Sequence, residues 1–212
     1  MGGGLMQLVA YGSQDTYLTG SPQVTFWKVV YRRHTNFALE SVEQTFNGVP
    51  GANANVVATV SRNGDLIHKC YLEVTVNSPN AVSNIEDVLT SVELEIGGQQ
   101  VDKQDGKWMD VWNKLSLPAS KRDGWNSMTK CPTALTVTDT LYIPLEFFFC
   151  TNPGLALPLI ALQYHEVRMK FKLGSKVGNA KLWVDYVYLD TDERRRMAQS
   201  SHEYLITQLQ HQ

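Results

Sequence analysis

The 212-residue sequence has few long apolar stretches and no recognisable targeting segment. It contains no run of about 18 apolar residues, so no helix is predicted to span a bilayer. Its start, Met1–Leu5, has neither a basic region nor a long apolar core, which does not fit a secretion signal. Met6 stands where the myristoylation pattern requires Ser or Thr. We therefore expect a chain that is synthesised in the cytoplasm.

Cysteine is also scarce, with only Cys70, Cys131 and Cys150. An odd and scattered set does not form a disulfide framework. No Cys-x-x-Cys pair is present, so a zinc site is not predicted. We expect buried thiols in a reducing compartment.

The sequence lacks an excess of basic charge and the common catalytic motifs. With 19 basic and 21 acidic residues the net charge is -2, which argues against nucleic-acid binding. The His-x-His of metal cupins, the Gly-x-Ser-x-Gly of hydrolases and the glycine-rich phosphate loops are all missing. A Ser-His-Asp triad assembled in space stays open. We predict no enzyme, and no catalytic, metal-binding or cofactor-binding residues.

What the sequence does contain is period-two alternation of apolar and polar residues. Val167–Leu173 alternates most clearly, and Ser91–Ile96 alternates and is followed by the glycine pair of a tight hairpin turn. Asn63-Gly64 is a second candidate hairpin turn. Pro144 places its strand at a sheet edge or at a bulge. The other predicted strands are Val24–Arg32, Val56–Ser61, Tyr71–Val76, Leu141–Phe149 and Leu182–Leu189.

Helix is predicted only at Trp108–Leu115 and, for a turn or two, at Leu155–Leu162. The stretch after Asp190 is ambiguous: Ser200 and Glu203 have capping-box spacing, whereas Leu205–Leu209 also fits a strand. About eight strands separated by turns predict an all-β fold, an antiparallel β-sandwich with one or two short helices. The aromatic residues expected to fill its core are Phe26, Trp27, Phe147, Phe148, Phe149 and Trp183.

Two charged segments and one apolar segment are candidates for contacts. Asp190–Arg196 is interpreted as a solvated loop with internal ion pairs, with a calcium or phosphate contact and an intersubunit strip as alternatives. Arg32-Arg33-His34 is a polar strand end that could face a neighbour. Asn152–Leu162 is apolar and contains two prolines, so we expect it to be core or to be buried against another subunit.

Several strings resemble the major capsid proteins of nucleocytoplasmic large DNA viruses, the group that includes iridoviruses and phycodnaviruses. They occur in the family's order from one end of the chain to the other. The strings are Gly4–Gly12, Gln14–Asp15, Tyr17–Gly20, Lys28–Phe37, Ser61–Ile67, Asn152–Val167, Asp190–Arg196 and His202–Ile206.

This resemblance implies an eight-stranded jelly roll, the first of the two in family members. It implies a structural protein, without catalytic residues or cofactors, that forms trimeric capsomers with copies of itself and contacts other capsid proteins. The icosahedral shell would enclose a viral membrane and assemble in the host cytoplasm. We expect residues 1–20 to be an N-terminal arm, 21–190 the jelly roll, and 191–212 a segment leading towards a second jelly roll that this sequence does not contain.

Three functional interpretations are carried forward. The first is a shell protein whose subunit contacts include Arg32, Arg33, Pro153, Leu155, Leu157, Pro158, Arg194, Arg195 and Arg196. The second is a minor capsid or penton protein with a single jelly roll, or a carbohydrate-binding sandwich on the virion with Trp108, Trp112 or Trp125 at its site. The third is a cupin-type metalloenzyme, which metal analysis would detect.

Overall fold

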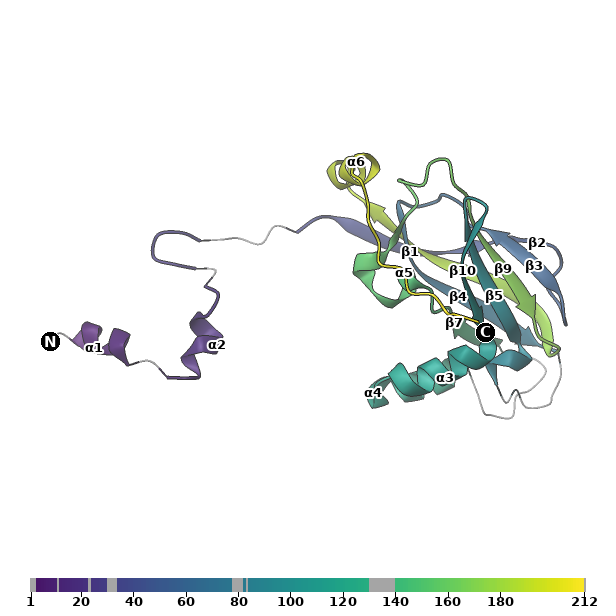
Figure 1. Cartoon of the computed structure of the whole chain (residues 1–212), viewed down its shortest axis with the longest axis horizontal. Coiled ribbons are helices and arrows are strands. Elements are labelled where there is room, and N and C mark those ends of the chain that lie inside the picture. The colour runs from purple at the N-terminus through teal and green to yellow at the C-terminus, as the bar shows by residue number, and fades with distance from the viewer. Residues whose placement is uncertain are drawn as a thin grey trace. The chain divides into compact units, whose positions relative to one another are not determined.

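The computed structural model describes residues 3–10, 12–22, 24–29, 34–77, 82, 84–129 and 140–211. The chain forms two units, Met1–Thr35 and Asn36–Gln212. The first unit contains the short helices α1 (Gly3–Val9) and α2 (Asp15–Thr19). The second contains all the β-strands that the structure describes, so the core of the protein lies there (Figure 1).

Strands from the two ends of the second unit pair with each other, and the strands between them pair in turn. The nested pairs are β1 (Phe37–Gln44) with β10 (Val177–Leu189), β3 (Asn55–Thr59) with β9 (Val167–Leu173), β4 (Leu66–Val76) with β7 (Thr140–Pro144), and β5 (Leu89–Ile96) with β6 (Gln99–Asp105). Every pair is antiparallel. Such nesting is the connectivity of a long hairpin that is rolled into two facing sheets, which is a jelly roll.

Each of the two sheets combines strands from the beginning, the middle and the end of the second unit. The first sheet has the order β1-β10-β4-β7, with β8 (Leu157–Pro158) added beside β4. The second has the order β2-β3-β9-β5-β6, in which β2 is Phe46–Asn47. Apart from the two-residue strands β2 and β8, each sheet has four strands among the described residues. The predicted eight-stranded antiparallel sandwich is therefore confirmed.

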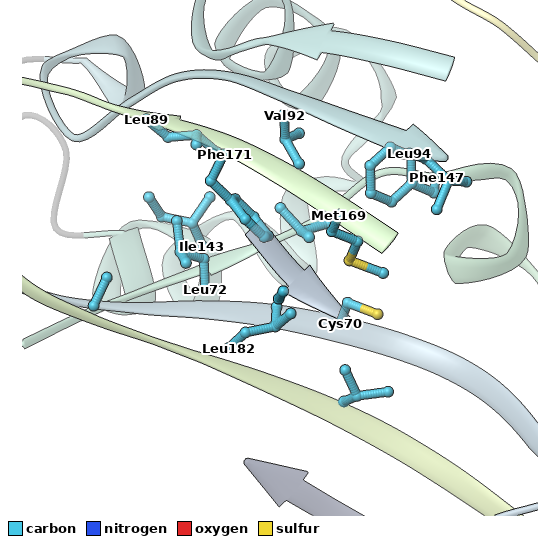
Figure 2. Packing of buried hydrophobic residues seen from close by; sticks show 14 of the residues in the cluster. Cys70, Leu72, Leu89, Val92, Leu94, Ile143, Phe147, Met169, Phe171 and Leu182 are labelled. Carbon is cyan, nitrogen blue, oxygen red and sulfur yellow. The ribbon is translucent and has the colours of Figure 1, made fainter. Parts of the chain in front are cut away.

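The core lies between these sheets and follows the predicted alternation. Along β9, Val167, Met169, Phe171 and Leu173 are buried while the residues between them are exposed. Figure 2 shows Met169 and Phe171 facing Cys70, Leu72 and Leu182 of the first sheet. A sandwich of two such faces removes both sets of apolar side chains from water, and this burial is the main favourable term in folding.

The aromatic contribution to the core differs in part from the prediction. Phe147, Phe148 and Phe149 are buried, as predicted. Phe26 and Trp27 are instead 91% and 87% exposed in the N-terminal unit, where their rings pack edge to face at 4.8 Å. Trp183 is half-buried, and its indole N–H donates to Glu73 at 2.6 Å. Adjacent aromatic residues in a sequence therefore do not by themselves identify the core.

One of the two predicted hairpin turns is present. Gly97 and Gly98 join β5 to β6 with φ angles of 61° and 84°, the left-handed values that a tight primed turn requires. Asn63-Gly64 does not close a hairpin, because the flanking strands β3 and β4 belong to different sheets. It is a crossover between the layers. Pro144 ends β7, which is an edge strand as predicted.

The predicted strand at Val24–Arg32 is not observed where the structure describes it. Val24 and Val29 form one isolated antiparallel bridge, and the backbone N–H of Thr25 donates to the carbonyl of Lys28 at 2.9 Å between them. Residues 30–33 lie outside the described part of the chain. The turn forms because the Thr25 hydroxyl also donates to the Lys28 carbonyl, which competes with an extended backbone.

Helices occupy more of the chain than predicted. The predicted helix Trp108–Leu115 lies within α3 (Gly106–Ser116), but α4 (Ala119–Thr129) was not predicted. The predicted turns at Leu155–Leu162 are instead the 3₁₀ turn η2 (Pro153–Leu155), the strand β8 and a turn. The remaining short elements are η1 (Ile85–Asp87) and α5 (Phe148–Thr151).

The C-terminal region differs from both predicted alternatives. Helix α6 spans Thr191–Gln199, and residues 200–211 form neither a helix nor a strand. Asp190 caps the helix by accepting a hydrogen bond from the Thr191 N–H at 2.7 Å. Acidic residues in the first turn favour this start because they complement the helix dipole. The helix therefore begins after the cap at Asp190, and no helix begins at Ser200, where the capping-box spacing would place one.

Candidate assembly surfaces

The described residues offer no cluster of metal-ligating side chains. Within them, no group of three or more His, Cys, Asp or Glu side chains is placed to hold a metal ion. None of the helices in that part of the chain is long and apolar enough to cross a membrane. The candidate functional regions are surfaces and the segments that shape them.

The first such region is α6, which is anchored to the sandwich by a buried carboxylate. Asp65 is buried, and its Oδ1 accepts from the Arg194 guanidinium at 2.8 Å. Its Oδ2 accepts from the backbone N–H of Leu189 at 2.9 Å. A buried carboxylate is stable only when its oxygens are paired in this way. Arg194 is thus a structural contact of α6 with the crossover between β3 and β4.

Residues Ser200–His211, the C-terminal strap, continue from α6 to the edge of the second sheet. The Tyr204 hydroxyl donates to the carbonyl of Ala156 at 3.1 Å. Further along, the backbone N–H of Leu209 donates to the buried Asp102 of β6 at 3.1 Å. The strap makes three more side-chain contacts to this strand. Gln208 donates to the Val101 carbonyl, and the His211 ring contacts the Lys103 carbonyl and the Asp105 carboxylate. Because β6 is an edge strand, the strap covers backbone groups that an open edge would expose.

The strap yields a first prediction. Replacing Asp102 with Ala removes the acceptor for Leu209 and also for the Gln104 side chain, which donates to Asp102 at 2.8 Å. We expect a loss of about 1–3 kcal/mol in local stability. Hydrogen exchange at residues 205–211 should become faster, while exchange in β4 stays slow. The exposed Asp123→Ala variant is the control, and unchanged exchange in the strap of Asp102→Ala would show that Asp102 is not the anchor.

The predicted apolar contact segment is mostly covered by its own chain. Leu157 and Pro158 are buried in β8, opposite Ile67 and Leu66 of β4. Leu155 is half-buried, whereas Pro153 is exposed. The segment was predicted to be core or to contact another subunit. Leu157 and Pro158 are buried within their own chain, as the first of these predictions requires. The segment also meets the strap, so two regions that the sequence analysis singled out separately lie against each other.

Asp190–Arg196, interpreted above as a loop with internal ion pairs, is instead the cap and most of helix α6, with one ion pair inside the segment. Arg196 pairs with Glu193 one turn earlier, and Arg194 pairs with Asp65. Arg195 is exposed. Arg32 and Arg33, the other two predicted contact residues, lie outside the described residues. Arg195 is therefore the arginine of α6 whose side chain is most available to another molecule.

A groove of about 730 Å³ lies between the helix pair α3–α4 and the edge of the first sheet. Trp112 and Trp125 line it, together with Glu146 and the buried Cys70 and Cys150. Burial raises the pKa of Glu146, and Lys69 and Asn113 oppose this rise. Burial also raises the pKa of the Cys70 thiol well above its usual range, with the hydrogen bond to Cys150 as a further cause. These two cysteines are thus the buried thiols predicted, while Cys131 lies outside the described residues.

The tryptophans proposed as a carbohydrate platform lie on or beside α3. Trp108 and Trp112 stack on each other, with ring centroids 5.5 Å apart and planes 9° from parallel. This mutual stacking uses one face of each ring. Trp125 packs against the core.

Sequence reasoning missed helix α4, strand β1 and the strap. A signal for α4 exists in Pro118, which directly precedes Ala119, because proline is favoured at the start of a helix. Strand β1 gave no alternation because its inward positions include Glu40 and Gln44. Gln44 is buried and accepts hydrogen bonds from both the backbone N–H and the hydroxyl of Ser61. A polar residue that is satisfied inside the core cannot be distinguished from a solvated one by its pattern.

Two facing sheets whose antiparallel strand pairs are nested place the chain in the class of jelly-roll β-sandwich proteins. Comparison with known proteins identifies the family: the chain matches the model of the major capsid protein N-terminus over residues 25–177. The chain therefore belongs to this family of viral capsid proteins.

Individual relatives agree with this assignment. The major capsid protein of Pyramimonas orientalis virus is 54% identical over 99% of this chain. That of Paramecium bursaria Chlorella virus 1 is 48% identical over 99% of it. A quasi-atomic model of the PBCV-1 virus capsid contains a chain that matches 88% of this one with a TM-score of 0.76 and 44% identity. This chain spans 59% of the length of the Pyramimonas orientalis virus protein and 53% of that of the Chlorella virus protein. It spans 50% of the length of the chain in the capsid model.

Proposed function

We propose that this chain is a structural component of a viral capsid and that it works by associating with copies of itself. The observation that carries the proposal is the sequence identity of 54% and 48% to two major capsid proteins, in alignments that cover 99% of this chain. A shell needs complementary surfaces and many modest contacts, and not a reactive group. The proposed location is the virion capsid, with assembly in the host cytoplasm.

The finer features follow from the resemblance and are part of the same proposal. Residues 1–20 act as an arm, 21–190 form the first jelly roll, and 191–212 lead towards a second. Three such chains form a capsomer, which contacts other capsid proteins and lies near an internal membrane. The relatives' greater length supports a second domain in the assembled protein. Enzymatic activity and nucleic-acid binding are not part of the proposed role.

The proposed contact residues can be narrowed by their burial. Arg195, Arg196 and Pro153 are exposed, and Leu155 is half-buried. Leu157, Pro158 and Arg194 are already engaged within the chain, so any part they play in assembly is to support the shape of the surface. We retain Arg32 and Arg33 as proposed contacts on the basis of the sequence alone.

The test is to reverse the charge of Arg195 in α6. Arg195→Glu should weaken self-association at least about tenfold, because a rim charge that meets a carboxylate would be replaced by like charges. Light scattering across a concentration series measures the association, and circular dichroism checks the fold. Arg194→Glu differs because it leaves the buried Asp65 unpaired, so its expected effect is a lower melting temperature.

The control is Arg168→Glu, which reverses an exposed charge on the opposite sheet and should leave association unchanged. If Arg195→Glu associates like the unaltered chain, α6 is not a contact. If the unaltered chain stays monomeric and does not enter particles together with other capsid proteins, the capsid role itself is wrong.

A further inference from the structure

Two cysteine side chains line the groove between the helix pair α3–α4 and the edge of the first sheet. Cys70 belongs to β4 and Cys150 belongs to α5. Both are free thiols in the structure, although they lie about 80 residues apart in the sequence. The fold therefore brings together two oxidisable groups that the sequence keeps far apart.

Contacts on both sides of the pair hold α5 against β4. The backbone N–H of Leu145, just before α5, donates to the carbonyl of Cys70 at 3.0 Å. The ring of His68 on β4 contacts the carbonyl of Phe149 in α5 at 3.4 Å. The two thiols are themselves close enough to share a hydrogen bond. The sulfur atoms are thus held near each other by the strand and the helix that carry them.

The two thiols differ in their access to solvent. Cys70 is 1% exposed, and Figure 2 shows its sulfur in the core between the two sheets. Burial also raises the pKa of this thiol, which keeps it neutral and unreactive towards reagents in solution. Cys150 is 8% exposed and is the more accessible of the two at the groove. A small reagent that enters the groove should therefore meet Cys150 first.

We propose that Cys70 and Cys150 are a redox-sensitive pair, which forms a disulfide under oxidising conditions and thereby ties α5 to β4. The pair stays reduced in a compartment that is rich in thiols and closes where small disulfides are abundant. The inference goes beyond the proposed capsid role and does not depend on it.

The reaction is a thiol–disulfide exchange in two steps, with a small disulfide as the oxidant. The Cys150 Sγ attacks one sulfur of the reagent, so a mixed disulfide forms and one thiolate of the reagent leaves. The Cys70 Sγ then attacks the Cys150 Sγ, and the second thiolate leaves as the Sγ–Sγ bond forms. The protons of the two cysteines pass to the two departing thiolates. Two cysteine thiols are oxidised, and one small disulfide is reduced to two thiols.

The disulfide should stabilise the segment that follows α5. The ring of Phe148 in α5 contacts that of Tyr204 in the strap, with centroids 6.4 Å apart, and the Tyr204 hydroxyl donates to the Ala156 carbonyl. Fixing α5 on β4 therefore restricts the region against which the strap lies. A bond that closes a loop of about 80 residues also removes conformational freedom from the unfolded chain.

The test is to incubate the folded, unaltered chain with 2-hydroxyethyl disulfide, which is small and neutral, and to map its disulfides by mass spectrometry. We expect a peptide pair that joins Cys70 to Cys150 and an intact mass that is lower by two hydrogens, and dithiothreitol should reverse both changes. The melting temperature of the oxidised chain should rise by about 5 °C or more. Hydrogen exchange at residues 148–156 should become slower, while exchange in β9 stays unchanged.

The matched controls remove one cysteine at a time. Cys131→Ala keeps the pair and should respond to the reagent as the unaltered chain does. Cys150→Ala removes the partner, so the reagent should leave Cys70 unmodified and the melting temperature unchanged. The peptide map of the unaltered chain decides the question even if Cys150→Ala does not fold.

Three outcomes would contradict the proposal. Both thiols could stay free in the folded chain while they react in the unfolded chain, the reaction could stop at the mixed disulfide on Cys150, or Cys131 could take the place of either partner. In each of these cases Cys70 and Cys150 are not a redox-sensitive pair, and the capsid role is unaffected.

Discussion

Phe171→Ala is expected to destabilise the protein by about 3–5 kcal/mol, the range measured for truncating a buried phenylalanine. The Phe171 side chain is 2% exposed and lies between the two sheets (Figure 2). Its ring meets that of Phe46 edge to face, with centroids 5.6 Å apart. Removing it leaves a cavity that the flanking strands β3 and β5 cannot fill without breaking their pairing with β9. Urea unfolding followed by tryptophan fluorescence measures the change in the free energy of unfolding.

The matched control is Phe37→Ala, which removes the same side chain from an exposed position on β1. We expect it to change the free energy of unfolding by less than about 0.5 kcal/mol. A loss below 1 kcal/mol for Phe171→Ala would mean that the ring does not fill the space between the sheets.

The core of this protein could be predicted because its strands obey a simple period. Along β9, each apolar residue faces the opposite sheet, and the intervening Arg168, Lys170 and Lys172 face outward. The turn at Gly97-Gly98 could also be predicted, because few residues other than glycine accept its backbone angles. These features depend on residues that are close in the sequence. The sandwich class follows from them, whereas the nested pairing of strands entered only through the resemblance.

The surfaces could not be predicted in the same way, because they depend on which residues other parts of the chain leave uncovered. Leu157 and Leu115 are both leucines in segments for which the sequence predicts a short helix. Leu157 is buried because β4 pairs with β8, whereas Leu115 is exposed because α3 turns its other side to the core. Asp65 and Asp102 gave no signal either, since their partners Arg194 and Leu209 are more than 100 residues away in the sequence. The burial of the leucines and the partners of the aspartates both depend on contacts between residues that are far apart in the sequence.

Gly174→Ala is the second substitution from which we expect a large loss, about 3 kcal/mol. Gly174 follows β9, and a Cβ atom on it would lie 2.2 Å from the Asp87 carbonyl oxygen and 2.8 Å from the Val88 nitrogen. Those atoms belong to the backbone around η1 and cannot swing aside as a side chain would. The Gly174 N–H also donates to the Val88 carbonyl at 2.9 Å, and its own carbonyl accepts from the Asn53 N–H at 3.0 Å. Moving the backbone apart would therefore break hydrogen bonds on both sides of the glycine.

The control for Gly174→Ala is Gly124→Ala in α4, where a Cβ atom would meet no atom within 4 Å. An added methyl group in a helix interior stabilises by about 1 kcal/mol, so the two substitutions should change the melting temperature in opposite directions. Differential scanning calorimetry of both variants measures this contrast. If Gly174→Ala melts at the temperature of the unaltered chain, η1 does not pack as closely on the β9–β10 turn as these distances require. A lower melting temperature confined to Gly174→Ala would show that this close approach of two backbones closes one end of the sandwich.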